Sequence, residues 1–115
     1  MKRIIMLAAA VTVLSFSAHA FAATPKLNGL VADPVKISLT SGGKKVAKLK
    51  AGTYTIVVKD TASDHDFHLT GPGVNKTTSV GGKGTFTWKV ALKKGTYTFV
   101  CDPHASFMKG SFTVQ

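Results

Sequence analysis

The chain has 115 residues, 44% of them hydrophobic, and a formal net charge of +10, so it is long enough for one small domain with its own core. Its only cysteine is Cys101, which excludes an internal disulfide. The only arginine, Arg3, lies near the N-terminus, and the lack of others argues against specific nucleic-acid recognition, which usually exploits the arginine fork.

The first 22 residues have the layout of a secretory signal peptide. Lys2 and Arg3 form a positive start, residues 4–16 are mostly apolar, and small-x-small motifs end at Ala20 and Ala22. The apolar run is shorter than the roughly 20 residues that span a bilayer. We therefore expect cleavage after residue 20 or 22 and a single domain over 23–115 without an integral membrane segment, in the periplasm or outside the cell. An uncleaved N-terminal anchor is the alternative.

Removal of Lys2 and Arg3 with this leader lowers the net charge from +10 to +8, and all the remaining cations are lysines. They are scattered, with adjacent pairs only at 44–45 and 93–94. One interpretation is a solvated surface that keeps the protein soluble and monomeric. The other is electrostatic steering toward an acidic partner protein or a membrane surface.

Apolar and polar residues alternate with a period of two over most of the mature chain, and no helical stripe is present. Residues 24–34 are predicted to be an irregular lead-in, because Pro25 and Pro34 limit regular structure. The alternation then predicts short strands over 35–40, 45–49, 54–58, 65–69, 86–90, 97–101 and 112–114. Seven or so such strands, separated by glycine, proline and serine turns, indicate an all-β antiparallel sandwich or barrel.

The end of the 97–101 strand carries the residues with the clearest chemistry. Cys101, His104 and Met108 follow one another within eight residues. A thiolate, an imidazole and a thioether are soft donors that suit copper better than magnesium, calcium or manganese. Each residue also has an ordinary interpretation: a buried small hydrophobe, an exposed loop histidine and an apolar plug, respectively. Their joint spacing favours a metal site at a strand end.

A further ligand has to come from elsewhere in the chain. His65 and His68 are the other histidines that remain after cleavage, and they have opposite phase on the predicted 65–69 strand. His65 shares the phase of Phe67 and Leu69, which places it on the inward face. We therefore favour His65 as the ligand and keep His68 as the alternative.

The segment 97–104, followed by Met108-Lys109-Gly110, resembles the ligand loop of the cupredoxins, the small blue copper proteins that include plastocyanin, pseudoazurin and amicyanin. His65-Asp66-Phe67 is similar to the family's first-histidine strand, where asparagine usually follows the ligand. The resemblance implies a Greek-key sandwich of about seven to eight strands, with one copper ion at one end. It also implies that His65, Cys101 and His104 are equatorial ligands and that Met108 is the weak axial one.

These features predict an exported type 1 copper protein that shuttles single electrons between redox partners and is not an enzyme. His104, with Ala105 and Phe107 around it, would be the electron port. A copper-delivery protein is the first alternative, although the mature chain keeps only one methionine. A metal-free β-sandwich interaction module is the second. Three histidines are too few for a multicopper oxidase, and no residue identifies a cysteine hydrolase.

Overall fold

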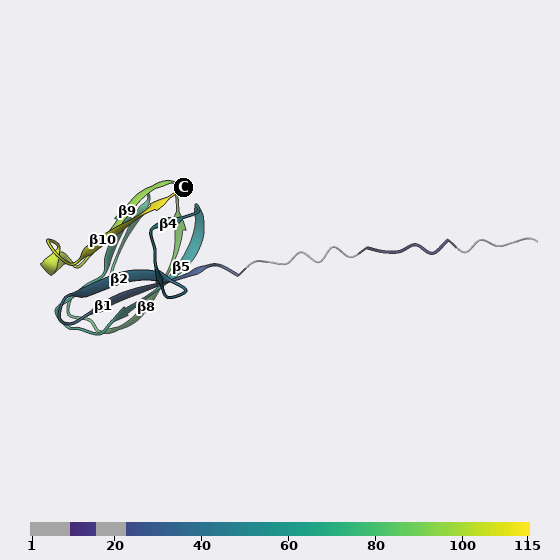
Figure 1. Cartoon of the computed structure of the whole chain (residues 1–115). Helices are drawn as coiled ribbons and strands as arrows, with labels where there is room; N and C mark the ends of the chain where they lie inside the picture. Colours follow the sequence, from purple (N-terminus) through teal and green to yellow (C-terminus); the bar gives the residue numbers. More distant parts are fainter. Residues whose placement is uncertain (1–9, 16–22) are drawn as a thin grey trace, which may run out of the picture.

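Two five-stranded sheets pack face to face and form a β-sandwich (Figure 1). The computed structural model describes residues 10–15 and 23–115, and residues 10–15 form no regular structure. The predicted leader therefore falls largely outside the described residues. Within them, no helix is long and apolar enough to cross a membrane.

The first sheet has the strand order β3-β2-β1-β5-β8. Its strands are β1 (Lys26–Ala32), β2 (Lys36–Ser41), β3 (Lys44–Lys45), β5 (Gly52–Asp60) and β8 (Gly84–Leu92). β1 pairs with β5 in parallel, and the other pairs of this sheet are antiparallel. The prediction of a purely antiparallel fold is wrong at this pair, because β1 and β5 run in the same direction along the sandwich.

The second sheet has the order β4-β10-β9-β6-β7. Its strands are β4 (Lys48–Leu49), β6 (His68–Gly71), β7 (Val74–Thr77), β9 (Gly95–Val100) and β10 (Lys109–Val114). β4 and β10 are parallel, and the remaining pairs are antiparallel. The all-β sandwich predicted from the alternation is confirmed, as two mixed sheets.

The lead-in predicted over 24–34 is wrong, because β1 occupies most of it. Leu27 and Val31 are buried, but Gly29 stands at the inward position between them, so the apolar alternation is interrupted. A Cβ at Gly29 would lie 3.1 Å from Val58 and 3.2 Å from the Phe67 ring. Close packing against Val58 of the neighbouring strand β5 and against the Phe67 ring therefore explains both the glycine and the weak strand signal.

Two further predictions differ from the structure in detail. The strand predicted over 45–49 is two short strands, β3 and β4, because the chain crosses from one sheet to the other at the buried Val46. Val35, predicted to face the core, precedes β2 and is 53% exposed. β7 has no counterpart among the predicted strands, since most of its residues are exposed.

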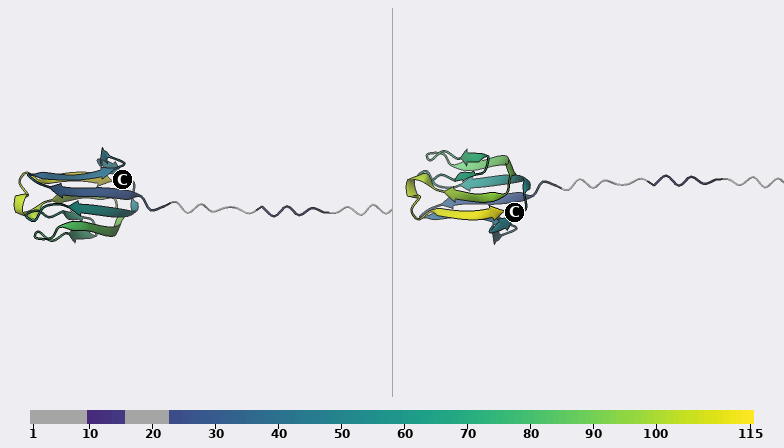
Figure 2. Two further views of the ribbon diagram at one scale, coloured as in Figure 1. Left: turned by 90° about the horizontal axis from the view of Figure 1, so that it is seen from below. Right: turned by 90° about the horizontal axis from the view of Figure 1, so that it is seen from above.

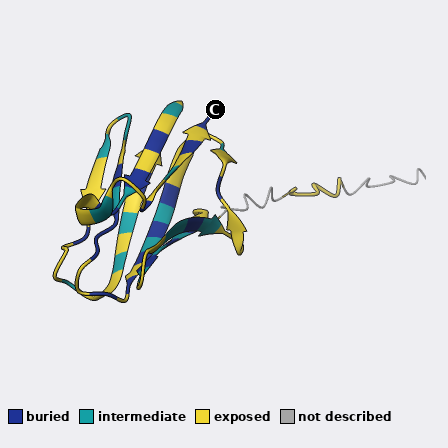
Figure 3. Ribbon diagram, turned by 60° about the vertical axis from the view of Figure 1, so that its left-hand side comes forward, coloured by how far each residue is buried: buried dark blue, intermediate teal, exposed yellow. Residues whose placement is uncertain are grey.

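The core lies between the sheets and is rich in aromatic residues. Phe67 stacks on Phe99 with ring centroids 5.4 Å apart, and Tyr97 stacks on Phe112 at 5.3 Å. Figure 3 shows the alternating buried and exposed bands along the long strands that this packing produces. Gly110 pairs with Phe99 across β9 and β10, and an added Cβ there would overlap the Phe99 ring.

One end of this sandwich carries the segment between β9 and β10. The segment contains the 3₁₀ turn η1 (Asp102–His104) and projects at the end opposite to the one where β1 begins and β10 ends (Figure 2). The connections after β1 and before β6 reach the same end. Residues distant in sequence therefore meet there.

Candidate metal centre

Three of the four predicted ligands meet at this end. The Nδ1 atoms of His65 and His104 are 3.1 Å apart. The Sγ atom of Cys101 lies 3.6 Å from His65 Nδ1 and 3.5 Å from His104 Nδ1. The three donors thus form a nearly regular triangle, contributed by two separate segments of the chain.

The size of this triangle fits a metal ion. Thiolate and imidazole ligands bind at about 2.3 and 2.0 Å, so three of them arranged around one ion lie about 3.5 Å from one another. The measured separations of 3.1–3.6 Å match that value. Burial raises the pKa of the Cys101 thiol, so a metal would have to displace its proton.

Met108 is fully buried at the end of the same loop. Its N–H donates to the His104 carbonyl oxygen at 2.8 Å, and its own carbonyl oxygen accepts from Cys101 N–H at 3.0 Å. His104 N–H in turn donates to the Cys101 carbonyl oxygen at 3.0 Å. This backbone network holds Cys101, His104 and Met108 in one tight loop.

His65 lies just before β6 and not within a strand as predicted, yet its side chain is buried. The segment is fixed because Phe67 and Thr78 exchange two hydrogen bonds, from Phe67 N–H to Thr78 Oγ1 at 2.9 Å and from Thr78 N–H to the Phe67 carbonyl oxygen at 3.1 Å. The Phe67 ring also stacks on Phe99 of β9. Both arrangements hold His65 against Cys101.

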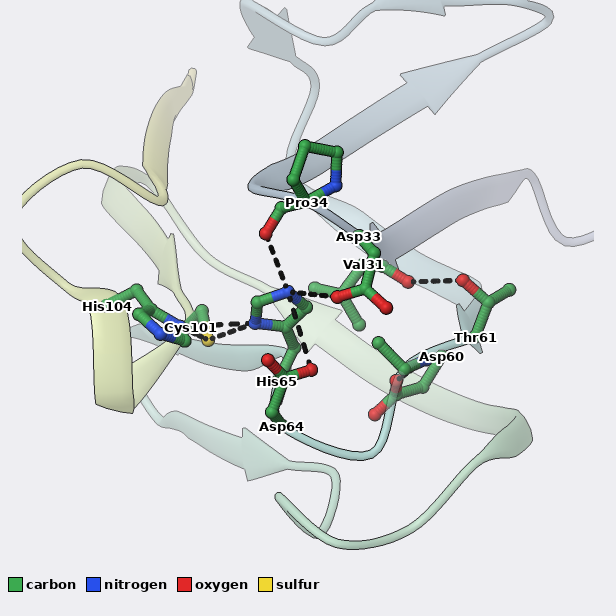
Figure 4. A network of polar contacts seen from close by, with 10 residues as sticks. Val31, Asp33, Pro34, Asp60, Thr61, Asp64, His65, Cys101 and His104 are labelled. Carbon is green, nitrogen blue, oxygen red and sulfur yellow. Dashed lines mark hydrogen bonds and ion pairs between the residues drawn. The ribbon is translucent and has the colours of Figure 1, made fainter.

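The far nitrogen of the His65 ring faces the β1–β2 connection (Figure 4). Nε2 lies 3.1 Å from the Pro34 carbonyl oxygen and 3.2 Å from Asp33 Oδ1. Asp64 Oδ1 is at 3.8 Å from the same nitrogen. Asp33 and Pro34 are distant from His65 in the sequence, and sequence reasoning missed them.

His68 lies apart from the triangle. Its Nδ1 contacts both carboxylate oxygens of Asp102, at 2.9 and 3.0 Å, and its Nε2 contacts Asn75 Oδ1 at 2.6 Å. These hydrogen bonds, first the one that His68 Nε2 donates to Asn75 Oδ1, raise the pKa of His68. The structure therefore brings His65, and not His68, to Cys101.

Asp66 stands where the sequence resemblance leads one to expect asparagine. Its Oδ1 accepts from Asp102 N–H at 2.6 Å, and its Oδ2 accepts from Thr77 Oγ1 at 3.2 Å. Asp66 is buried, and this burial raises its pKa. The carboxyl group links the segment before β6 to the turn that follows Cys101.

All five acidic residues of the chain lie around this end. Asp33 and Asp64 face His65, Asp66 and Asp102 join the two ligand segments, and Asp60 ends β5. In contrast, the 13 lysines after residue 25 are all exposed. The carboxyl groups are thus concentrated beside the donors.

The surface over His104 is apolar. His104 is partly exposed, and the Phe107 ring lies 5.5 Å from its ring with 59% of the residue exposed. Ala105 is exposed beside them, as the sequence predicted. We refer to His104, Ala105 and Phe107 as the apolar rim.

A family model described as a cupredoxin-like domain matches residues 4–114. Among solved structures, rusticyanin variants match with 21% identity and a TM-score of 0.60, covering 84% of this chain and 80% of theirs. A methionine-to-glutamine variant of rusticyanin matches with 20% identity and a TM-score of 0.59, covering 78% of this chain and 76% of the other. Rusticyanin from Thiobacillus ferrooxidans has 20% identity and a TM-score of 0.55 at the same coverage. Comparison with curated proteins finds no match.

The structural likeness shows the fold, and the family match covers nearly the whole chain. The soft donor triangle at the end of that fold identifies copper as the metal of the centre. The chain belongs to the cupredoxin family.

Proposed function

We propose that this chain is an exported type 1 copper protein that carries single electrons between redox partners. His65, Cys101 and His104 are its equatorial ligands and Met108 its weak axial ligand. The observation that carries the proposal is the buried triangle of Nδ1, Nδ1 and Sγ donors at 3.1–3.6 Å. Copper bound there would supply a one-electron couple between its two common oxidation states.

The role of the chain is to keep the donors in place as the charge of the site changes. The backbone network of the 101–108 loop and the Asp66 hydrogen bonds join the two ligand segments. The stack of Phe67 on Phe99 anchors both segments in the core. A site held this firmly needs little rearrangement between oxidation states, which favours fast electron transfer.

The apolar rim is the proposed docking patch and electron port. His104 is the proposed ligand that reaches the surface, and Phe107 extends the contact area beside it. Redox partners bind through small, transient interfaces, and a patch of this kind fits that mode. The carboxyl groups gather at this end, but the net charge of the whole chain is positive, which would speed the first encounter with an acidic partner.

The burial of the donors favours a carrier over a copper-delivery protein. Delivery requires a site from which the metal exchanges readily, whereas His65, Cys101 and Met108 are each at most 1% exposed. Slow loss of copper to a modest chelator would agree with a carrier. Rapid loss would instead favour delivery.

The decisive test is a visible absorption and EPR spectrum of the copper(II)-loaded protein. We expect an intense thiolate-to-copper band and the EPR signature of a type 1 site in the wild type. Cys101→Ser should lose the band and remain folded by circular dichroism. A wild-type protein that binds copper without the intense band would refute the proposed site.

We further propose that residues 1–22 are removed on export and that residues 23–115 act as a monomer. The charged start, the apolar run and the two cleavage motifs support this. Mass spectrometry of protein recovered from the periplasm of a bacterial host should give a chain beginning at residue 21 or 23. A full-length mass in the membrane fraction would indicate a retained anchor.

A further inference from the structure

The ring of His65 has one nitrogen toward Cys101 and the other toward the β1–β2 connection (Figure 4). Nε2 faces two acceptors there, the Pro34 carbonyl oxygen at 3.1 Å and Asp33 Oδ1 at 3.2 Å. Neither acceptor can donate a proton. The hydrogen must therefore be on Nε2, where it is donated to the Pro34 carbonyl oxygen, with the Asp33 carboxylate beside it.

This arrangement leaves Nδ1 of His65 without a proton and with its lone pair toward Cys101 and His104. A metal-bound histidine commonly donates its other N–H to a carbonyl or a carboxylate, which fixes the tautomer and the ring orientation. Here the carbonyl alone would suffice for orientation. The carboxylate of Asp33 adds a negative charge 3.2 Å from the same nitrogen.

We propose that Asp33 is a positioning residue that lowers the reduction potential of the centre, an inference that rests on the proposed function. Its negative charge beside Nε2 stabilises the positive charge that the ring gains when Nδ1 donates to Cu(II), so the ring is a stronger electron donor at Nδ1. A more basic ligand stabilises Cu(II) more than Cu(I). The chain thus holds the potential below the value its four ligands alone would set.

The neighbouring Asp64 provides a matched comparison. Both aspartates are well exposed, at 69% and 62% of their side chains, and both face Nε2 of His65. Asp33 lies within hydrogen-bonding distance at 3.2 Å, whereas Asp64 is at 3.8 Å. Loss of either removes one negative charge, but the charge of Asp33 lies 3.2 Å from Nε2 and that of Asp64 3.8 Å.

The test compares Asp33→Asn, Asp33→Ala and Asp64→Asn with the wild type by spectroelectrochemical titration of the copper-loaded proteins. Loss of an outer-shell partner typically changes metal affinity 10–100-fold. In both Asp33 variants we expect the affinity for Cu(I), relative to that for Cu(II), to rise about tenfold. For a one-electron couple this raises the reduction potential of the centre by about 59 mV. Asp64→Asn should shift the reduction potential by less than half as much.

Ionic strength gives a second readout. At about 1 M salt the Debye length is about 3 Å, so an effect of mere proximity is screened. The differences of both Asp33→Asn and Asp64→Asn from the wild type should therefore shrink at high salt, and that of Asp33→Asn should fall by the larger amount. Because the Pro34 carbonyl oxygen still accepts from Nε2–H, the Asp33 variants should keep the thiolate band and the wild-type melting profile.

Several outcomes would overturn the inference. Asp33 variants with a wild-type potential, or an Asp64→Asn shift as large as that of Asp33→Asn, would show that the Asp33 carboxylate beside Nε2 does not set the reduction potential. Should Asp33→Ala fail to fold, the isosteric Asp33→Asn carries the test. A wild-type protein without the thiolate band would instead refute the proposed function, so the two failures are distinguishable.

Discussion

The backbone N–H of Cys101 donates to the carbonyl oxygen of Met108 at 3.0 Å, so one hydrogen bond joins the first and last residues of the ligand loop. Phe107 N–H and Met108 N–H both donate to the His104 carbonyl oxygen, at 3.1 and 2.8 Å. The length of the segment between Cys101 and Met108 is therefore matched to a closed turn. The backbone position of Met108 is fixed by hydrogen bonds within the loop.

This backbone hydrogen bond between Cys101 and Met108 makes Met108→Leu an informative substitution. Leucine has a similar volume, so the loop should close as before, and only the thioether donor is lost. We expect the variant to keep the thiolate band. Because Cu(I) prefers fewer ligands, the variant's reduction potential should rise on the order of 59 mV, which corresponds to a tenfold change in the ratio of Cu(I) to Cu(II) affinity. An unchanged potential would show that the Met108 sulfur does not reach the metal.

The two histidines before and within β6 should respond differently to substitution. His65→Gln should abolish the thiolate band, because it removes one corner of the donor triangle. His68→Gln should keep the band and cost about 0–1 kcal/mol in unfolding free energy, since the partly exposed pair with Asp102 is a surface interaction. Absorption spectra of the copper-loaded variants check the thiolate band, and urea unfolding checks the free energy of unfolding. Loss of the band in His68→Gln alone would reverse the ligand assignment.

Gly110→Ala should destabilise the fold. The new Cβ would overlap the Phe99 ring, which is itself stacked on Phe67, so the core cannot yield freely. Overpacking of this kind costs about 1–3 kcal/mol. Gly81→Ala is the matched control, because a Cβ at Gly81 meets nothing within 4 Å. Its free energy of unfolding should stay within about 0.5 kcal/mol of the wild-type value. Equal unfolding free energies for the two variants would contradict the packing argument.

Asp60 should make stability depend on pH. Its carboxyl is buried, Oδ1 accepts from Ala62 N–H at 3.1 Å, and Oδ2 has no hydrogen-bond partner among residues 10–15 and 23–115. Burial raises the pKa of Asp60 in the folded state, so the folded protein holds this proton more tightly than the unfolded chain. The free energy of folding that this raised pKa contributes is fully present below about pH 3.9, the ordinary pKa of aspartate. It is lost as the pH rises through the pKa of Asp60 in the folded state.

Asp60→Asn should remove this part of the dependence. Urea unfolding over a pH series measures the slope of the unfolding free energy in the wild type and in the variant. We expect the wild type to lose stability, relative to the variant, as pH rises above the ordinary aspartate value. Parallel curves for the two proteins would contradict the assignment.

Phe107→Ser should slow electron exchange without changing the centre. The substitution reduces the apolar rim beside His104 but touches none of the donors. We expect an unchanged absorption spectrum and a self-exchange rate, measured by NMR line broadening, that falls about tenfold, equivalent to about 1.4 kcal/mol of contact energy. An unchanged rate would place the docking patch elsewhere.

Much of the fold could be predicted from period-two alternation. Strands with an uninterrupted apolar face, such as β5 and β9, have buried inward residues as predicted. β1 was missed because its central inward position is Gly29, and β7 because only Val74 is even partly buried. Alternation detects apolar burial, so it fails where packing selects a glycine or where a strand lies at an edge.

The same distinction applies to the site. The phase argument predicted a buried His65 and a more exposed His68, and both are found. The phase argument could not predict Asp33 and Pro34, whose approach to His65 depends on the parallel pairing of β1 with β5. Nor does it anticipate a buried Asp66, because that residue lies in a loop, where alternation does not apply.

The uneven placement of charge gives the molecule a permanent electric dipole. Lys44 and Lys45 of β3, and Lys93 and Lys94 between β8 and β9, lie at the end where β1 begins, whereas all five carboxyl groups lie at the ligand end. In the field of a negatively charged surface, the lysine end would lead and the ligand end would point outward. Adsorption on such a surface and electron exchange through the apolar rim would therefore use opposite poles and could occur at the same time.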